Sequence, residues 1–215
     1  INIGSHAGEI SQGANAVALG NEAGRYTSGI GAVAVGYQAG QNSQSTYAVA
    51  IGYQTGQTDQ SIDAVAIGNR AGRAGQGDSA VAIGVQAGQT GQNVRSVAIG
   101  YRSGENTQGA SAIAIGNNAG LDSQGQLAVA IGCGAGYTGQ GQNAIAIGHL
   151  AGATGQFAGS IVLNASGAAL NAGETGFFVD PVRNATGLSG FTGSLWYNSA
   201  THEIGINQDV IPDGT

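Results

Sequence analysis

The chain is set apart first by the residues it has few of. Its 215 residues include no methionine, no lysine, one cysteine and two prolines, and only 8% of them are charged. A single cysteine, Cys133, excludes an intrachain disulfide. The basic residues are all arginines without a basic stripe, and the net charge is -6, so nucleic acid and anionic membranes are unfavourable partners. No apolar run reaches the roughly 20 residues of a transmembrane helix, so we expect no membrane insertion.

Glycine, by contrast, is abundant, and it recurs with a fixed step. There are 41 glycines, and one of them follows a phrase such as Ala144-Ile145-Ala146-Ile147 in every 16 residues. A period this short predicts a β-solenoid in which each repeat is one coil. We number the repeat glycine position 0 and expect the chain to turn sharply there at positive φ, where a Cβ would clash. The predicted turn glycines are Gly20, Gly36, Gly52, Gly68, Gly84, Gly100, Gly116, Gly132 and Gly148.

The four residues before each repeat glycine alternate in size. Positions −3 and −1 hold Val, Ile or Leu, whereas positions −4 and −2 are almost always Ala. This period of two predicts one β-strand per coil, stacked in parallel at about 4.8 Å. We expect the larger residues to fill the roll and the alanine face to point outwards, as an interface between copies of the chain. The predicted trimer interface consists of Ala50, Ala66, Ala82, Ala98, Ala114 and Ala130.

Position +8 is glutamine in almost every coil, with Ser28 as an exception. Glutamines in register can hydrogen-bond to one another between coils as an amide ladder. The alternative is that each glutamine satisfies backbone groups at its own turn. The predicted ladder residues are Gln44, Gln60, Gln76, Gln92, Gln108, Gln124 and Gln140.

The repeated Ala-Val-Ala-Ile-Gly phrase, seen for example in residues 80–92, resembles the head repeats of YadA-like trimeric autotransporter adhesins. It also resembles repeats in phage tail-fibre proteins and in fibre-like proteins of large algal viruses. The resemblance covers residues 1–164. It implies a left-handed parallel β-roll, assembled as a homotrimer and located outside the cell or on a virion surface.

The composition changes after the repeats. Both prolines, all four phenylalanines and the only tryptophan lie in residues 157–215. We therefore divide the chain into a β-roll, residues 1–164, and a small β-rich capping or docking segment, residues 165–215, since a solenoid needs its last edge covered. Asn164 stands in the glycine column, and we expect it to adopt the left-handed conformation that Asn tolerates.

No catalytic, cofactor or metal-binding motif accompanies the repeat. The three histidines share no column, which argues against a metal site, and the chain needs no cofactor for the function we expect. A glycan-cleaving tail spike would require two carboxylates about 5–10 Å apart. Asp63 and Asp78, in adjacent coils, could approach that distance, but a surface charge cluster with Arg95 is the simpler interpretation.

The function expected from the sequence is therefore that of a non-enzymatic structural protein, a trimeric rod in a viral fibre or other host-attachment structure. Its partners would be its own copies and a host-surface glycan or protein. Tyr37, Tyr53 and Tyr101 share position +1 and could stack on sugars, although packing between coils explains them equally well. The alternatives are a surface-anchored bacterial adhesin, an extracellular structural filament and the tail spike.

Overall fold

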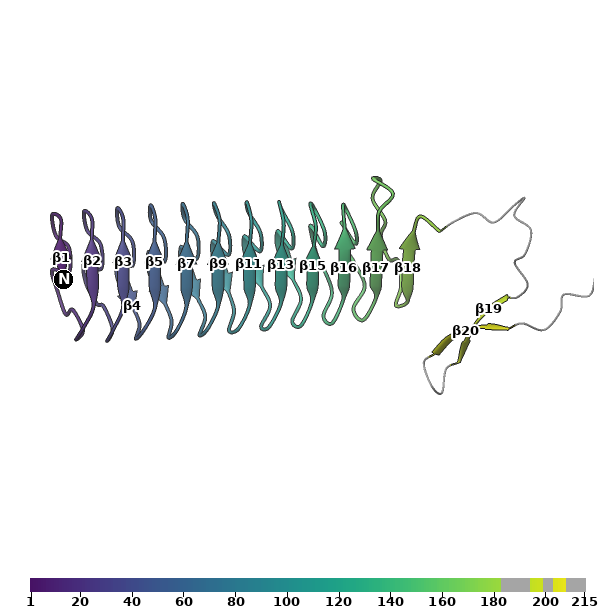
Figure 1. Ribbon diagram of the computed structural model, residues 1–215, viewed down its shortest axis with the longest axis horizontal. Helices are drawn as coiled ribbons and strands as arrows, with labels where there is room; N and C mark the ends of the chain where they lie inside the picture. The colour runs from purple at the N-terminus through teal and green to yellow at the C-terminus, as the bar shows by residue number, and fades with distance from the viewer. Residues whose placement is uncertain (183–193, 199–202, 208–215) are drawn as a thin grey trace, which may run out of the picture. The chain divides into compact units, whose positions relative to one another are not determined.

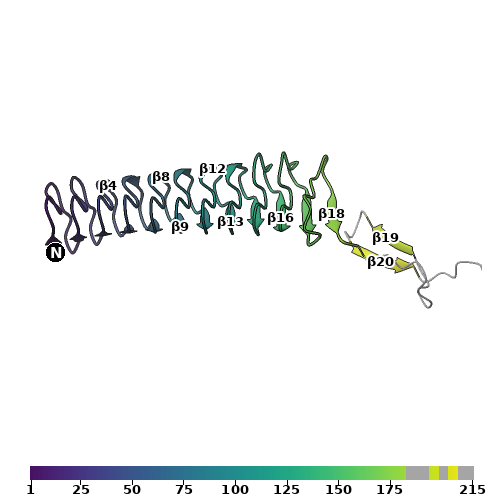
Figure 2. The same cartoon turned by 90° about the horizontal axis from the view of Figure 1, so that it is seen from above.

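The computed structural model describes residues 1–182, 194–198 and 203–207. They fall into two units, Ile1–Pro181 and Val182–Thr215. The first unit is an all-β parallel solenoid whose coils lie side by side (Figures 1 and 2). The second contains an antiparallel pair, β19 (Ser194–Asn198) and β20 (Glu203–Asn207). The described residues hold no helix, and hence none able to cross a lipid bilayer.

The solenoid has two walls of parallel strands. The longer wall is a 12-stranded sheet. Its strands are β1 (Asn2–Ile3), β2 (Val17–Leu19), β3 (Val33–Val35), β5 (Val49–Ile51), β7 (Val65–Ile67), β9 (Val81–Ile83), β11 (Val97–Ile99), β13 (Ile113–Ile115), β15 (Val129–Ile131), β16 (Ile145–Gly148), β17 (Ile161–Asn164) and β18 (Phe177–Asp180). The second wall is a 6-stranded sheet. Its strands are β4 (Asn42–Gln44), β6 (Thr58–Gln60), β8 (Ala74–Gln76), β10 (Thr90–Gln92), β12 (Asn106–Gln108) and β14 (Asp122–Gln124).

The register of the longer sheet follows the repeat. Val65 pairs with Val81, and Ala66 pairs with Ala82. Each column of the sequence is therefore a row of identical or similar side chains along the solenoid, and β-branched residues suit this pleated surface. The predicted parallel β-solenoid with 16-residue coils is confirmed.

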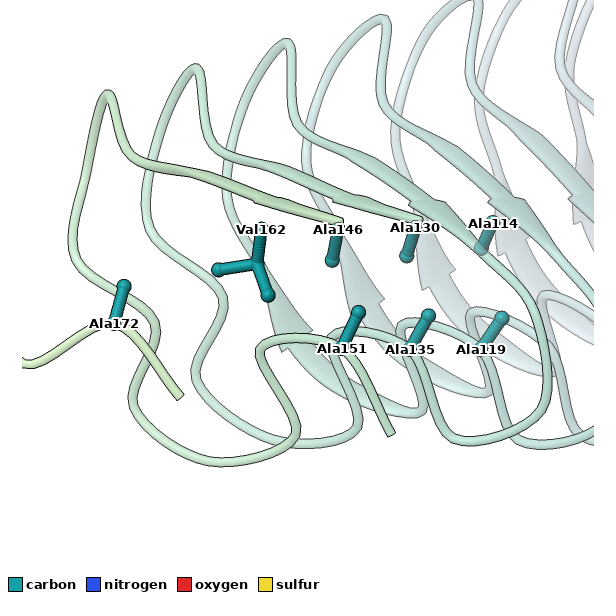
Figure 3. Packing of buried hydrophobic residues seen from close by; sticks show 8 residues of the cluster. All are labelled: Ala114, Ala119, Ala130, Ala135, Ala146, Ala151, Val162 and Ala172. Atoms are coloured by element: carbon teal, nitrogen blue, oxygen red, sulfur yellow. The ribbon is translucent and has the colours of Figure 1, made fainter. Parts of the chain in front are cut away.

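The two faces of this sheet are the reverse of the prediction. Alanine lines the interior, where it meets a second row of alanines at position +3, in the turns on the opposite side of the roll, as Ala130 and Ala135 illustrate (Figure 3). The predicted interface residues are each 0% exposed within a single chain: Ala50, Ala66, Ala82, Ala98, Ala114 and Ala130. They cannot contact another copy. The roll is so narrow that methyl groups and glutamine side chains fill it, and the larger aliphatic residues must point outwards.

Glycine at position 0 is required by both conformation and space. From Gly20 to Gly148 the φ values of these glycines lie between 111° and 137°. A Cβ added at Gly68 would lie 2.5 Å from the carbonyl oxygen of Gly84 in the next coil. The backbones of the two coils lie too close together at this point for any side chain to fit between them.

The solenoid continues past the boundary predicted at residue 164. Strand β18 pairs in parallel with β17, so that Phe178 follows Val162 in the row that alanine occupies elsewhere. Phe178 packs against the buried cluster that includes Val162 and Ala172 and thereby fills the end of the roll. Asn164 is not among the residues at positive φ, contrary to expectation. Its Nδ2 instead donates hydrogen bonds to the carbonyl oxygens of His149 and Ala168, at 2.7 and 2.6 Å.

Candidate functional site

The most extensive surface feature is the outer aliphatic face, which we define as positions −3 and −1 of the 12-stranded sheet. The valines at −3 are half-buried, and the isoleucines at −1 are more open. Ile3, in the first strand, is 61% exposed, and along the rest of the sheet the most exposed of these isoleucines are Ile51 (38%), Ile67 (36%), Ile83 (36%), Ile115 (36%), Ile131 (37%) and Ile147 (41%). Phe177 and Val179 extend the same rows into β18. Positions −4 to −1 hold no charged residue from β1 to β18.

A contiguous apolar surface of this length is unusual on a soluble monomer, where such patches rarely exceed a few hundred Å². Its residues are β-branched, and their side chains lose little rotamer freedom when covered. The outer aliphatic face is thus suited to bury itself against another protein surface. Sequence reasoning assigned this role to the alanines. The alanine at +3, replaced only by Thr55 and Ser103 from Ala7 to Ala151, would have indicated a narrow interior and was left without a role.

Inside the roll, the glutamines at +8 form a continuous chain of hydrogen bonds. Gln60 Nε2 donates to Gln76 Oε1 in the next coil at 3.1 Å, and also to the carbonyl oxygen of Val49 at 2.8 Å. The same pattern repeats in each coil from Gln44 to Gln156 at 3.1–3.2 Å. The glutamines therefore make both kinds of contact that the sequence suggested, to one another and to the backbone.

A second amide chain runs along the outside, at positions +2 and +5. Arg70 Nε donates to Gln54 Oε1 at 3.2 Å, Gln54 Nε2 donates to Gln38 at 2.9 Å, and Gln38 Nε2 donates to Glu22 at 2.8 Å. Parallel to it, Arg73 donates to Gln57 and Gln57 to Gln41. Gln41 then donates to Glu22 as well. A carboxylate thus accepts at one end of both chains, and arginines donate at the other.

The remaining charges form local pairs on the surface. Arg25 Nε lies 2.7 Å from Glu9 Oε2, and this hydrogen bond lowers the pKa of the Glu9 carboxyl. Arg102 Nε lies 2.6 Å from Glu105 Oε2, which raises the pKa of the Arg102 guanidinium. Both pairs lie at coil corners in variable columns. Glu9 and Arg25 are partly exposed, and such a pair contributes little to stability. Glu105 is buried, at 7% exposure, so its pair with Arg102 is partly shielded from water.

Of the two aspartates considered for glycan cleavage, Asp78 has a backbone partner next to Asp63. Asp78 Oδ1 accepts a hydrogen bond from the backbone amide of Ile62 at 3.3 Å, which is a structural role. Within the described part of the chain, no group of three or more His, Cys, Asp and Glu side chains lies close enough to hold a metal ion.

Two of the three tyrosines at +1 stack on each other. The rings of Tyr37 and Tyr53 lie 5.3 Å apart, centroid to centroid, with an interplanar angle of 11°. Each ring thereby covers one face of the other, which leaves that face unable to stack on a sugar. This contact is packing between coils, the second of the two interpretations that the sequence allowed.

Residues 28–55 and 140–158 match the YadA head domain repeat. Two segments of the solenoid are therefore similar to YadA head repeats. The matched residues include the phrase around Gly36 and the glutamines at +8, which are the turn and ladder features described above. Repeats of this type belong to trimeric, surface-exposed adhesins rather than to enzymes. No curated protein and no solved structure matches the chain.

Proposed function

We propose that the chain is the rod of a non-enzymatic attachment fibre in which three copies associate through the outer aliphatic face. The observation that carries the proposal is the uncharged, half-open row of Val and Ile on one side of the 12-stranded sheet. The YadA head-type repeats support a trimer, because the heads that carry this repeat are homotrimeric.

Another copy of the same chain is the partner that fits this surface best. The outer aliphatic face repeats at the strand spacing, about 4.8 Å. A partner must offer rows with the same spacing to bury every coil equally, and an identical coil does so. Burial of apolar surface contributes about 25 cal/mol per Å², and each coil would add a similar amount. The assembly would therefore gain stability with the number of coils.

Such a rod would hold its variable columns away from the point where it is attached. Charged and aromatic residues lie at the corners and on the side opposite the outer aliphatic face, and these would contact a host-surface glycan or protein. We place the rod in a viral fibre on the virion surface. The second candidate is a surface-anchored bacterial adhesin or extracellular filament, which the YadA repeat favours. The sequence that flanks these repeats in the complete protein distinguishes the two.

The double variant Ile67→Arg/Ile83→Arg tests the interface. Two guanidinium groups per chain would have to be buried without partners, which is strongly unfavourable. We expect the mass measured by light scattering to fall from three chains to one, while circular dichroism still reports β-structure.

The matched control is Ile62→Arg. Ile62 is 48% exposed but lies at +10, in a column where the next coil carries Asp78. This control should remain trimeric. A trimeric Ile67→Arg/Ile83→Arg protein, or a control that dissociates to the same extent, would refute the assignment of the interface.

A further inference from the structure

The inner glutamine ladder lacks one rung near its start. At +8 the order is Gln12, Ser28, Gln44, and from Gln44 onwards every rung is present up to Gln156. Ser28 is buried, at 4% exposure, and its Oγ donates to the carbonyl oxygen of Gly24 in its own coil at 3.2 Å. The side chain of serine is shorter than that of glutamine and has no carboxamide group. Its hydroxyl therefore does not reach the neighbouring glutamine on either side of the ladder.

Two buried polar atoms flank this position and form no hydrogen bond. They are Nε2 of Gln12, a donor, and Oε1 of Gln44, an acceptor. In the later coils, each Oε1 accepts from the Nε2 of the preceding glutamine, as Gln60 does from Gln44. Oε1 of Gln44 therefore faces back toward the coil of Ser28. Gln44 itself is only 1% exposed, so bulk water does not reach it freely. An unpaired buried group of this kind destabilises the folded chain.

The backbone adds acceptors at the same place. In the complete coils, the glutamine amide also donates to the carbonyl at −3 of its own repeat, as Gln44 does to Val33 at 2.8 Å. It donates again to the carbonyl at −4 of the following repeat, as Gln44 does to Ala48 at 3.1 Å. The equivalent carbonyls for the missing rung belong to Val17 and Ala32. The position is thus bounded by one unpaired N–H and by several oxygens.

These groups define the chemistry of a ligand. It must accept from Gln12 and donate to Gln44 and to backbone carbonyls, in a space about two strand spacings long. An anion would face carbonyl oxygens, and a cation would face the amide N–H of Gln12 without any carboxylate to balance it. A small neutral molecule that both donates and accepts fits, and water is such a molecule.

We propose that the gap at Ser28 is an internal water site, in which bound water replaces the absent carboxamide and connects Gln12 to Gln44. A buried water typically makes about three hydrogen bonds and occupies roughly 30 Å³. The missing arm of the glutamine leaves room for such a molecule beside polar partners. The ladder is then continuous from Gln12 to Gln156, with one rung made of solvent.

Ser28→Gln tests this site in the full chain. The introduced amide should displace the water, complete the ladder and raise the Tm by on the order of 2–4 °C. A crystal structure of the unmodified chain should contain ordered water within hydrogen-bond distance of Gln44 Oε1, and that of the variant should not.

The reverse substitution, Gln76→Ser, is the matched control. It should lower the Tm and create a second water site, facing Gln92 Oε1. The proposal is overturned if Gln44 Oε1 in the unmodified crystal is paired with a protein group instead of water. It is equally overturned if Ser28→Gln lowers the Tm, because the gap would then have no room for a polar group.

Discussion

Glycine at position 0 has a backbone conformation that other residues rarely adopt, and it also lies against the next coil. These two constraints can be separated by comparing two glycines. Gly68 has φ of 134°, and an added Cβ would lie 2.5 Å from the carbonyl oxygen of Gly84. Gly75 has φ of 68°, and the nearest atom to its added Cβ, Gly91 N, is 3.9 Å away. Only the first combines an unfavourable φ with a clash.

We therefore expect Gly75→Ala to reduce the free energy of unfolding by about 1–2 kcal/mol, the cost of a left-handed alanine. Gly68→Ala should cost more than about 3 kcal/mol, because the neighbouring backbone must move as well. Denaturant unfolding of the two variants measures the difference. Equal costs would mean that the contact between coils at position 0 is not as close as described.

The identity of the turn residue could be read from the sequence, but the direction of each side chain could not. Alternation at −4 to −1 predicts two faces and does not say which is inside. The usual rule places Val and Ile in the interior. Here the rule fails because the interior has no space for them: Ala66 and Ala71, from opposite walls, belong to one buried cluster. The alanine found at +3 in most coils and the glutamine at +8 were the residues that indicated a narrow interior.

At the scale of the element, the two walls are held together in different ways. The 12-stranded sheet has the β-branched residues that favour strands. The 6-stranded sheet has Thr, Asn, Asp and Gly at +6 and +7, with residues such as Asp59 at positive φ, 53°. Propensity gives no reason to expect a strand there, and none was predicted. Its strands end at +8, where the inner glutamine ladder links one coil to the next.

Two glutamines of one coil test this difference. Gln60 is fully buried in the inner ladder, whereas Gln57 is half-buried in the outer amide chain, where water can replace its partners. Gln60→Leu should cost about 1–3 kcal/mol, because it leaves Gln76 Oε1 without its donor and removes one hydrogen bond of the Gln44 amide. Gln57→Leu should cost less than about 1 kcal/mol.

Thermal or denaturant unfolding, with the same substitution at both positions, provides the measurement. If Gln57→Leu proved as costly as Gln60→Leu, the inner ladder would not be the element that holds the second wall.

The end of the solenoid was predicted one strand too early for a similar reason. The step of 16 residues persists from Ile161 to Phe177, since these two residues pair. The residue types change, however, because this strand closes the end of the roll instead of continuing the same interior into another coil. Phe178 replaces the small interior residue and fills the end of the roll. The sequence predicts a short strand in residues 176–184, but its composition assigned it to the capping segment, whereas the 16-residue spacing assigns it to the solenoid. Within the predicted β-rich segment 165–215, residues 194–198 form β19, and the residues on either side of it lie outside the described part of the chain.

At the scale of the whole molecule, the account depends on the outer aliphatic face. Within one chain, alanine and glutamine fill most of the interior, so the Val and Ile residues of the outer aliphatic face are not needed there. The outer aliphatic face fills no space inside the chain. Its large residues are explained if they pack between chains. The fold was predictable from the period, whereas the interface required knowledge of which face is buried.

The measurement that tests this claim most directly is the mass of the unmodified chain in solution, determined by light scattering at micromolar concentration. The account predicts three times the chain mass of 21.0 kDa. A stable monomer of 21.0 kDa, with the outer aliphatic face open to water, would contradict it.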